Sequence, residues 1–352
     1  MTRWVVLEPL DTIVIRDGRA FDAGTNSEAR AVLPSPSTIA GAVGAAYGAP
    51  PGAGRDPAAR GTILPERVQR PFIASRTAAG WETHWPLPGD VIQVGRGLER
   101  MRLSSPGPGE VTDLSDQVEM FLSAPQDSEP AEGWWDGDAL GAYLCDGRVS
   151  GNLSAFCEGE GGRQPWRVER RVGIARENRM AAEGMIYSTE HLRLAEGHGL
   201  AARCVGGPMG SLPVRTVDFG GRGRRAQIHQ AASVAMPEPV TDFPGGRMLL
   251  YLATPAVFPG GDWKPRIAGA RLVAAAVGPP QVITTVTASG GRVRGGLLMW
   301  AAPAASVYYL CFPDEEAAAQ AAGRLQDEPL EQAEDWMRSA GFGFALPGRW
   351  SA

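Results

Sequence analysis

The stretch LPSPSTIAGAVGAAY, residues 33–47, decides the expected fold. Prolines at positions 34 and 36 precede Ser37 and Thr38, which are good helix caps, and a run of small residues follows. The pattern predicts a helix that begins near Ser37 and packs tightly on a sheet. Residues 4–7 and 12–15 are short β-rich runs, so the chain is expected to open as strand, loop and helix.

Beyond this opening, residues 48–165 carry many turn signals and no sustained period, which indicates extended loops and short hairpins. Residues 181–193 look ordered again. A second unit begins near Arg247, with strands expected at 248–254, 272–277, 281–287, 297–301 and 306–312. Residues 314–325 and 328–340 have the acidic first turns and apolar spacing of helices, and 341–350 is a glycine-flanked closing strand. This order predicts a ferredoxin-like α+β unit.

Length and composition indicate about two globular domains. The chain has 352 residues, of which 43% are hydrophobic and 21% charged. Its longest uncharged runs contain prolines or glycines, and Glu8 comes too early for a signal-peptide core, so we expect a cytoplasmic protein without membrane contact. The four cysteines include no C-x-x-C pair, so we expect no metal site, and the sequence suggests no cofactor.

Charge is unevenly distributed along the chain. The formal net charge is −5, but residues 101–160 hold 2 basic and 12 acidic residues, whereas residues 161–230 hold 12 basic and 6 acidic ones. Affinity for a phosphate backbone depends on local basic surface, so the second segment could bind nucleic acid despite the acidic total. An exposed, salt-bridged face is the alternative interpretation. The acidic segment indicates a surface insertion that could dock a basic partner.

The turn at residues 217–228 joins two strand-like segments through glycines. Glycine permits a positive φ angle and close approach of another backbone, so the turn could bring amide N–H groups and arginines against phosphates. It lacks the spacing of a dinucleotide-binding motif, and the chain has no Walker-type phosphate loop.

Several motifs, in order along the chain, resemble those of a known family. They are Pro9-x-Asp11, Arg16-Asp17-x-Arg19-x-Phe21, Leu33 to Ala42, Arg171-Val172-Gly173-Ile174, Glu183 to Tyr187, Phe219-Gly220-Gly221, Pro303 to Tyr308 and Gly341-Phe342-Gly343. Together they look like the third subunit of the Cmr (type III-B) CRISPR effector complex, in the RAMP superfamily. A sister RAMP subunit from another type III system would have similar features.

The resemblance implies an α+β fold with two ferredoxin-like (RRM-like) domains in one chain with long insertions. We expect a domain at 1–240, with insertions at about 48–165 that include the acidic 101–160, and a second domain at 241–352. The family implies a noncatalytic subunit of a hetero-oligomeric complex. Its partners would be the repeat-derived 5′ tag of the guide RNA, the large polymerase-like subunit and the first backbone RAMP subunit.

This sequence departs from the family at two places. Arg222 follows Gly220-Gly221 where the family commonly has glutamate, and Ala305 stands where it usually has glycine. The first change could strengthen phosphate contact or alter a partner contact. The second puts in doubt any glycine-specific role carried over to position 305.

We expect RNA to be held by arginine guanidinium groups and backbone N–H donors. The candidate residues are Arg16, Arg19 and Asn26 of the first loop, then Arg170, Arg171 and Arg176, and finally Gly220, Gly221, Arg222 and Arg224.

No catalytic residue is predicted. RNA cleavage without metal needs a proton shuttle, most often histidine. In the related repeat-cleaving endoribonucleases this histidine commonly lies near the first helix, and here residues 37–47 contain none. Two alternatives remain. One is a guide-processing endoribonuclease that uses an unrecognised histidine such as His191, and the other is a structural adaptor that binds only proteins.

Overall fold

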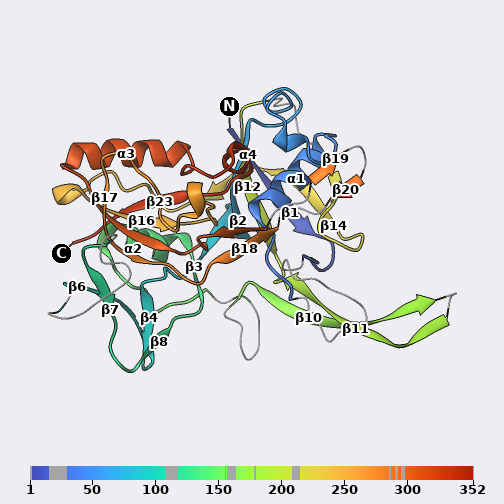
Figure 1. Ribbon diagram of the computed structural model, residues 1–352, viewed down its shortest axis with the longest axis horizontal. Helices are drawn as coiled ribbons and strands as arrows, with labels where there is room; N and C mark the ends of the chain where they lie inside the picture. Colours follow the sequence, from blue (N-terminus) through green and yellow to red (C-terminus); the bar gives the residue numbers. More distant parts are fainter. Residues whose placement is uncertain are drawn as a thin grey trace.

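The computed structural model describes residues 2–15, 30–105, 107, 118–154, 156, 164–177, 180–207, 215–284, 287–289, 292–294 and 298–351; side chains at 174–177, 181–186, 287–289 and 292–294 are not described. The protein is strand-rich with few helices, which confirms the mixed α and β composition expected (Figure 1). No helix in these ranges is long and apolar enough to span a membrane.

The larger sheet is formed by strands between residues 2 and 235. In spatial order its strands are β13 (Arg215–Asp218), β14 (Arg225–Ala231), β1 (Thr2–Pro9), β12 (His198–Val205), β2 (Arg67–Thr77), β3 (Gly80–Pro86) and β15 (Val234–Ala235), and β9 (Trp134–Trp135) also pairs with β3. Its four central strands, β14-β1-β12-β2, are antiparallel to their neighbours. If these four strands are numbered 1 to 4 in chain order, their order across the sheet is 4-1-3-2.

Helix α1 (Pro36–Ala46) covers one face of this sheet, as the sequence predicts. It begins within one residue of the expected start, with Ser35 at the N-cap. Ile39 and Val43 are buried against Val5 and Leu7 of β1. The prolines before the helix and the small side chains within it explain both its sharp start and its close packing.

A second, four-stranded sheet lies in the last third of the chain. Its spatial order is β17 (Arg271–Ala276), β22 (Val307–Cys311), β16 (Arg247–Leu252) and β23 (Ala345–Arg349), all antiparallel. Read from β23, this is again the order 4-1-3-2. Helix α3 (Glu315–Asp327) lies along one side and α2 (Gly137–Asp146) along the other (Figure 1).

Two expectations about secondary structure were wrong. Residues 48–165 are not only loops and hairpins, because β2 and β3 belong to the main sheet and α2 is a helix with one buried face. Residues 328–340 are helical only in α4 (Asp335–Ala340). The backbone N–H groups of Leu330 and Ala333 instead donate to the Gly343 and Val257 carbonyls. Contacts with distant segments override the local helical pattern there.

The remaining strands form small antiparallel sheets. They are β4 (Val91–Val94), β5 (Gly97–Arg100) and β8 (Ser128–Pro130); β6 (Arg102–Ser104) with β7 (Phe121–Ser123); β10 (Trp166–Glu177) with β11 (Met180–Leu194); β18 (Gln281–Thr284) with β21 (Leu298–Ala301); and β19 (Thr287–Ser289) with β20 (Arg292–Arg294). The β10–β11 hairpin extends away from the body of the molecule (Figure 1).

The acidic segment contributes to the core as well as to the surface. Trp135, Leu140 and Tyr143 are fully buried in the same cluster as the second sheet. Buried Asp90 accepts hydrogen bonds from Tyr143 at 2.6 Å, from Tyr309 at 2.5 Å and from Arg100 at 2.9 Å. A buried carboxylate needs such partners, so this network ties the segment to β22.

Candidate nucleic-acid interface

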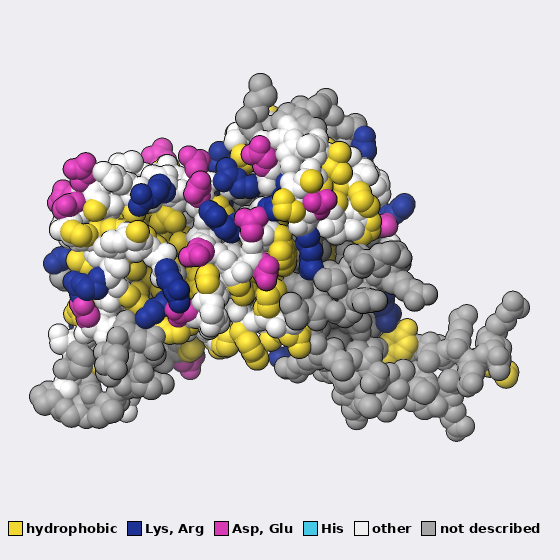
Figure 2. All heavy atoms as spheres, turned by 45° about the horizontal axis from the view of Figure 1, so that its top comes forward, with side chains coloured by type: hydrophobic (Ala, Val, Ile, Leu, Met, Phe, Trp, Pro, Cys, Tyr) yellow, Lys and Arg dark blue, Asp and Glu magenta, His cyan; other side chains and the backbone are white. Residues whose placement is uncertain are grey.

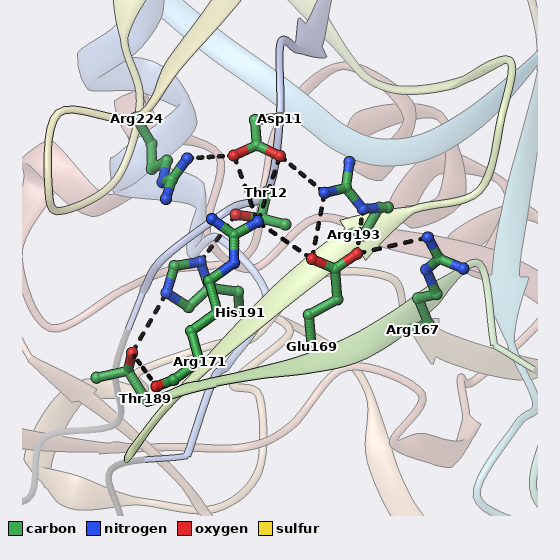
Figure 3. Close-up of polar contacts among 9 residues, drawn as sticks. All are labelled: Asp11, Thr12, Arg167, Glu169, Arg171, Thr189, His191, Arg193 and Arg224. Carbon is green, nitrogen blue, oxygen red and sulfur yellow. Dashed lines mark hydrogen bonds and ion pairs between the residues drawn. The ribbon is translucent and has the colours of Figure 1, made fainter. Parts of the chain in front are cut away.

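Three segments that are far apart in sequence meet beside the end of β1. Ile13 and Leu192 of β11 form an isolated bridge, with backbone hydrogen bonds of 2.7 and 2.9 Å. The glycine turn between β13 and β14 joins them, because the Gly221 N–H donates to the Val14 carbonyl at 2.7 Å. Residues 10–15, the base of the β10–β11 hairpin and this turn therefore present side chains to one place (Figure 3).

Strand alternation puts one set of polar side chains of the hairpin on the same face. Successive residues of a strand point to opposite sides, and directly paired residues share a side. The paired residues on this face are Arg167 with Arg193, Glu169 with His191, and Arg171 with Thr189. The face carries three arginines and one carboxylate, and it is turned toward Asp11 (Figure 3).

Asp11 connects the three segments through its carboxylate. Its Oδ1 accepts a hydrogen bond from Arg193 at 2.7 Å, and its Oδ2 forms an ion pair with Arg224 of the glycine turn. Arg171 Nη2 lies 3.5 Å away. Burial alone would raise the pKa of Asp11, but the Arg193 hydrogen bond and the charges of Arg171 and Arg224 outweigh it and lower the pKa.

Glu169 is the second carboxylate of the cluster. It forms an ion pair with Arg193 and accepts a hydrogen bond from Arg171 at 3.1 Å, and Arg167 lies 3.5 Å away. The hydrogen bonds from Arg193 and Arg171 lower the pKa of Glu169 to about 2. Glu169 is therefore ionised at any pH at which the protein would normally be studied.

The cluster keeps an excess of positive charge. Four arginines face two carboxylates, which leaves a formal charge of two. The exposed fraction of the arginine side chains ranges from 23% for Arg224 to 68% for Arg167. On the face shown in Figure 2, basic and acidic side chains are interspersed. A partly exposed, net cationic cluster can bind an anion such as a phosphate.

His191 lies beneath these arginines and is buried. Its Nδ1 is 2.8 Å from the Thr12 hydroxyl and its Nε2 is 3.4 Å from the Thr189 hydroxyl. Burial and the positive charges of Arg171 and Arg224 lower its pKa, so the ring is neutral. Both ring nitrogens lie beside hydroxyls and the ring is enclosed, which is unfavourable for proton exchange with a bound RNA.

The structure brings two of the predicted arginines into this cluster, Arg171 and Arg224, and both pair with Asp11. Arg170 lies on the opposite face of the hairpin, 3.3 Å from Glu190. Exposed Arg222 has a left-handed backbone, with φ of 58°, and its guanidinium lies 5.0 Å from the centre of the Tyr187 ring. Arg222 has no carboxylate partner among the residues the structure describes.

The two predicted glycines pack against the protein's own backbone. Gly220 has φ of 86°, and a Cβ atom there would lie 2.9 Å from the Val14 carbonyl oxygen. The Gly221 N–H is engaged by that same carbonyl, so it is not the bare phosphate donor that the sequence suggested. These glycines are needed for close approach within the chain.

Four other predicted residues cannot be assigned a contact. Arg16, Arg19 and Asn26 lie outside the described residues, as does the side chain of Arg176. Sequence reasoning also missed Glu169 and Arg193. Polar residues at alternate positions, 167, 169 and 171 and again 189, 191 and 193, were the available signal for them.

Metal ligands are not gathered at this site. Within the described ranges, no group of three or more His, Cys, Asp and Glu residues is placed to hold a metal ion. The cluster is instead dominated by guanidinium groups, whose chemistry is to bind and orient anions.

Comparison with known proteins supports an assignment to a family. A model of the family described as CRISPR-associated protein (Cas_Cmr3) matches residues 5–350. Two cryo-EM structures of the type III-B Cmr-beta complex contain similar chains. One, bound to cognate target RNA and AMPPnP, matches with 16% identity, a TM-score of 0.49 and coverage of 87% of this chain and 86% of the other. The other, bound to cognate target RNA, matches with 15% identity, a TM-score of 0.48 and the same coverages.

No curated protein matches this chain. The family match extends over nearly the whole sequence, in agreement with the ordered motifs that run from Pro9 to Gly343, and it confirms the resemblance to the third Cmr subunit. The chain therefore belongs to the CRISPR-associated Cmr3 family.

Proposed function

We propose that this protein is a noncatalytic subunit of a type III-B CRISPR effector complex that binds the repeat-derived 5′ tag of the guide RNA. Family membership supports the role of an effector subunit. The net cationic cluster around Asp11 carries the RNA-binding part of the proposal, because arginine forks bind phosphates and orient a strand without chemistry. The subunit would also bridge the large polymerase-like subunit to the first backbone subunit.

The fold is compatible with this function. The four central strands of the larger sheet and the four strands of the second sheet are antiparallel and have the order 4-1-3-2, and each set keeps one crossover helix, α1 in the first and α3 in the second. We infer that each is a ferredoxin-like unit, within 1–240 and 241–352 respectively. RRM domains, which bind single-stranded RNA, share a four-stranded sheet of this kind.

A role in positioning RNA explains why carboxylates are present among the arginines. Asp11 and Glu169 hold Arg171 and Arg193 in fixed directions, so less side-chain entropy is lost when a phosphate binds. The two excess charges are then available to the RNA. His191 would maintain the packing below the arginines and would not act as a catalyst.

Arg222 lies next to the cluster, in the same glycine turn as Arg224, and offers the cleanest test. It is exposed, and unlike Arg224 it does not pair with Asp11, so replacing it leaves the ion pairs of the cluster in place. We expect Arg222→Gln to weaken binding of an RNA that carries the 5′ tag and to reduce the slope of log affinity against log salt by about 0.7, the value for one phosphate contact on a single strand. Fluorescence anisotropy over a range of salt concentrations measures both effects.

The matched control is Arg266→Gln. It removes an exposed arginine of the second unit whose guanidinium forms a long ion pair, 3.9 Å, with Asp262. It should change neither affinity nor slope. Unchanged RNA binding by the Arg222 variant would count against this site. Absence of any RNA crosslink to this subunit in the assembled complex would favour the protein-only adaptor.

A further inference from the structure

Two arginines of the larger sheet meet at the C-terminal end of α3. Arg70 of β2 donates a hydrogen bond through Nη2 to the Gln326 carbonyl. The side-chain amide of Gln69 donates to the Asp327 carbonyl at 3.1 Å. Arg203 of β12 pairs directly with Gln69, and its guanidinium lies 3.8 Å from the Asp327 carboxylate. Two guanidinium groups therefore approach the same helix end.

The backbone of β2 is bent where it carries Arg70. The register of β2 against β12 shifts between Gln69 and Phe72, so Arg70 and Pro71 together oppose one residue of β12. Such a β-bulge redirects side chains. Arg70 has φ of 56°, a left-handed conformation that is unfavourable for a residue with a Cβ atom. Strain of this kind persists only where the surrounding structure holds it, and it is common in ligand-binding segments.

The positive charge of the two arginines is incompletely balanced. Burial and the charge of Arg203 lower the pKa of Arg70 to about 10, and Asp327 only partly opposes this effect. The Asp327 side chain is 75% exposed, whereas that of Arg203 is 19% exposed, so solvent screens the carboxylate. Arg70 Nε is buried without a hydrogen-bond partner among the residues that the structure describes. Capping of α3 therefore leaves a buried donor unused.

A cavity of about 230 Å³ lies beside both arginines. Apolar side chains, among them Met236 and Leu346, form most of its other walls, and exposed Glu238 also borders it. The Arg70 guanidinium lies 4.6 Å from the centre of the buried Phe344 ring, a contact that orients it toward this space. The cavity is smaller than the roughly 300–1,000 Å³ of pockets for drug-sized ligands, so it suits a small anion.

We propose that this cavity is a phosphate-binding site, separate from the Asp11 cluster. Arg70 and Arg203 hold the anion between them, and its charge offsets their mutual repulsion. Guanidinium groups match the geometry of phosphate oxygens. Because the cavity is lined by residues of the larger sheet, of α3 and of the second sheet, a bound phosphate also stabilises the contact between the two units. The inference goes beyond the proposed function and does not depend on it.

The test uses the full chain and inorganic phosphate, with sodium chloride keeping the ionic strength constant. Isothermal titration calorimetry measures the affinity. Arg203→Gln should weaken phosphate binding by about 10-fold or more, the effect of losing a charge-assisted hydrogen bond. Asp327→Asn should strengthen it by about 2-fold, because an exposed carboxylate no longer competes for Arg203.

Melting temperatures separate a ligand site from a helix cap. Phosphate should raise the melting temperature of the wild type more than that of Arg203→Gln, so the difference between them should grow with phosphate concentration. If the variant instead melts lower by the same amount with and without phosphate, Arg203 serves only to pair with Asp327 and the inference is overturned. Arg266→Gln, which replaces an exposed arginine, is the matched control and corrects for the general stabilising effect of phosphate.

Asp327→Asn keeps the test open if Arg203→Gln does not fold, since it changes an exposed side chain. Phosphate binding that is unchanged or weaker in this variant contradicts the site.

Competition then identifies the source of the phosphate. Displacement of bound phosphate by a ten-nucleotide oligouridylate would assign the site to an RNA backbone, and phosphate binding that RNA does not affect would assign it to a free anion. Equal phosphate affinity for the wild type and Arg203→Gln overturns the inference, whatever the effect of Arg222→Gln on tag RNA.

Discussion

Replacing Glu169 by glutamine tests whether the arginine cluster stabilises the fold. The substitution keeps the size of the side chain and removes its charge, while Arg193 and Arg171 stay in place. Lowering the pKa of Glu169 from 4.5 to about 2 corresponds to at most about 3.4 kcal/mol. Because 24% of the side chain is exposed, solvent screens the interaction, and we expect the variant to lose about 1–2 kcal/mol at pH 7.

The direction of the pKa shift of Glu169 decides how its contribution to stability changes with pH. The folded protein holds Glu169 ionised more strongly than the unfolded chain does, so the stabilisation is fully present above pH 4.5. It is lost as the pH falls from 4.5 toward 2, where Glu169 becomes protonated in the folded state. The difference in unfolding free energy between the wild type and Glu169→Gln should therefore shrink at low pH.

Urea denaturation at pH 7 and near pH 3 measures this difference. Asp218→Asn is the control, because Asp218 is 81% exposed and, among the residues the structure describes, its one ion-pair partner is exposed Arg225; it should change stability by less than about 0.5 kcal/mol. Equal unfolding free energies for the wild type and Glu169→Gln at pH 7, or a difference that does not change with pH, would refute the reasoning.

Three further predictions test the packing. Gly220→Ala should lower the free energy of unfolding by about 1–3 kcal/mol, because the added Cβ would lie 2.9 Å from a backbone oxygen. The Cβ added by Gly223→Ala would have no atom within 4 Å, so this variant should lose less stability. Chemical denaturation compares the two variants. Asp90→Asn should lose about 3–5 kcal/mol, since it leaves the largely buried Arg100 guanidinium without its carboxylate, and the melting temperature reports the loss. Ala305→Gly should gain about 0.5–1 kcal/mol in a urea titration, because Ala305 has φ of 72°; a loss would contradict the strain argument.

Much of the fold could be predicted because its signals are local. The capped run of small residues marked α1, and β-rich segments marked β1, β16 and β22. Failures occurred where distant contacts decide the structure. Residues 328–334 have a helical pattern, yet Leu330 and Ala333 donate to carbonyls elsewhere in the chain. The turn-rich segment after α1 contains β2 and β3, which depend on pairing with β12 and with each other.

Contacts between distant residues also limited what could be predicted of the candidate site. Its arginine-rich segments and the glycine turn could be located from composition, but the sequence around Asp11 does not show that this residue joins them. Its partners Arg193 and Arg224 are 182 and 213 residues away in the chain. No local pattern reports such a contact.

The sequence by itself determined the family, the positions of the main helices and strands, and where positive charge is concentrated, because these depend on short-range order and composition. Only the tertiary structure decided which arginines are held by carboxylates, which glycines serve internal packing, and which of the ten tryptophans, Trp300, is the most exposed. The reason is physical: ion pairing, close packing and exposure depend on distances between atoms that the linear order of residues does not specify.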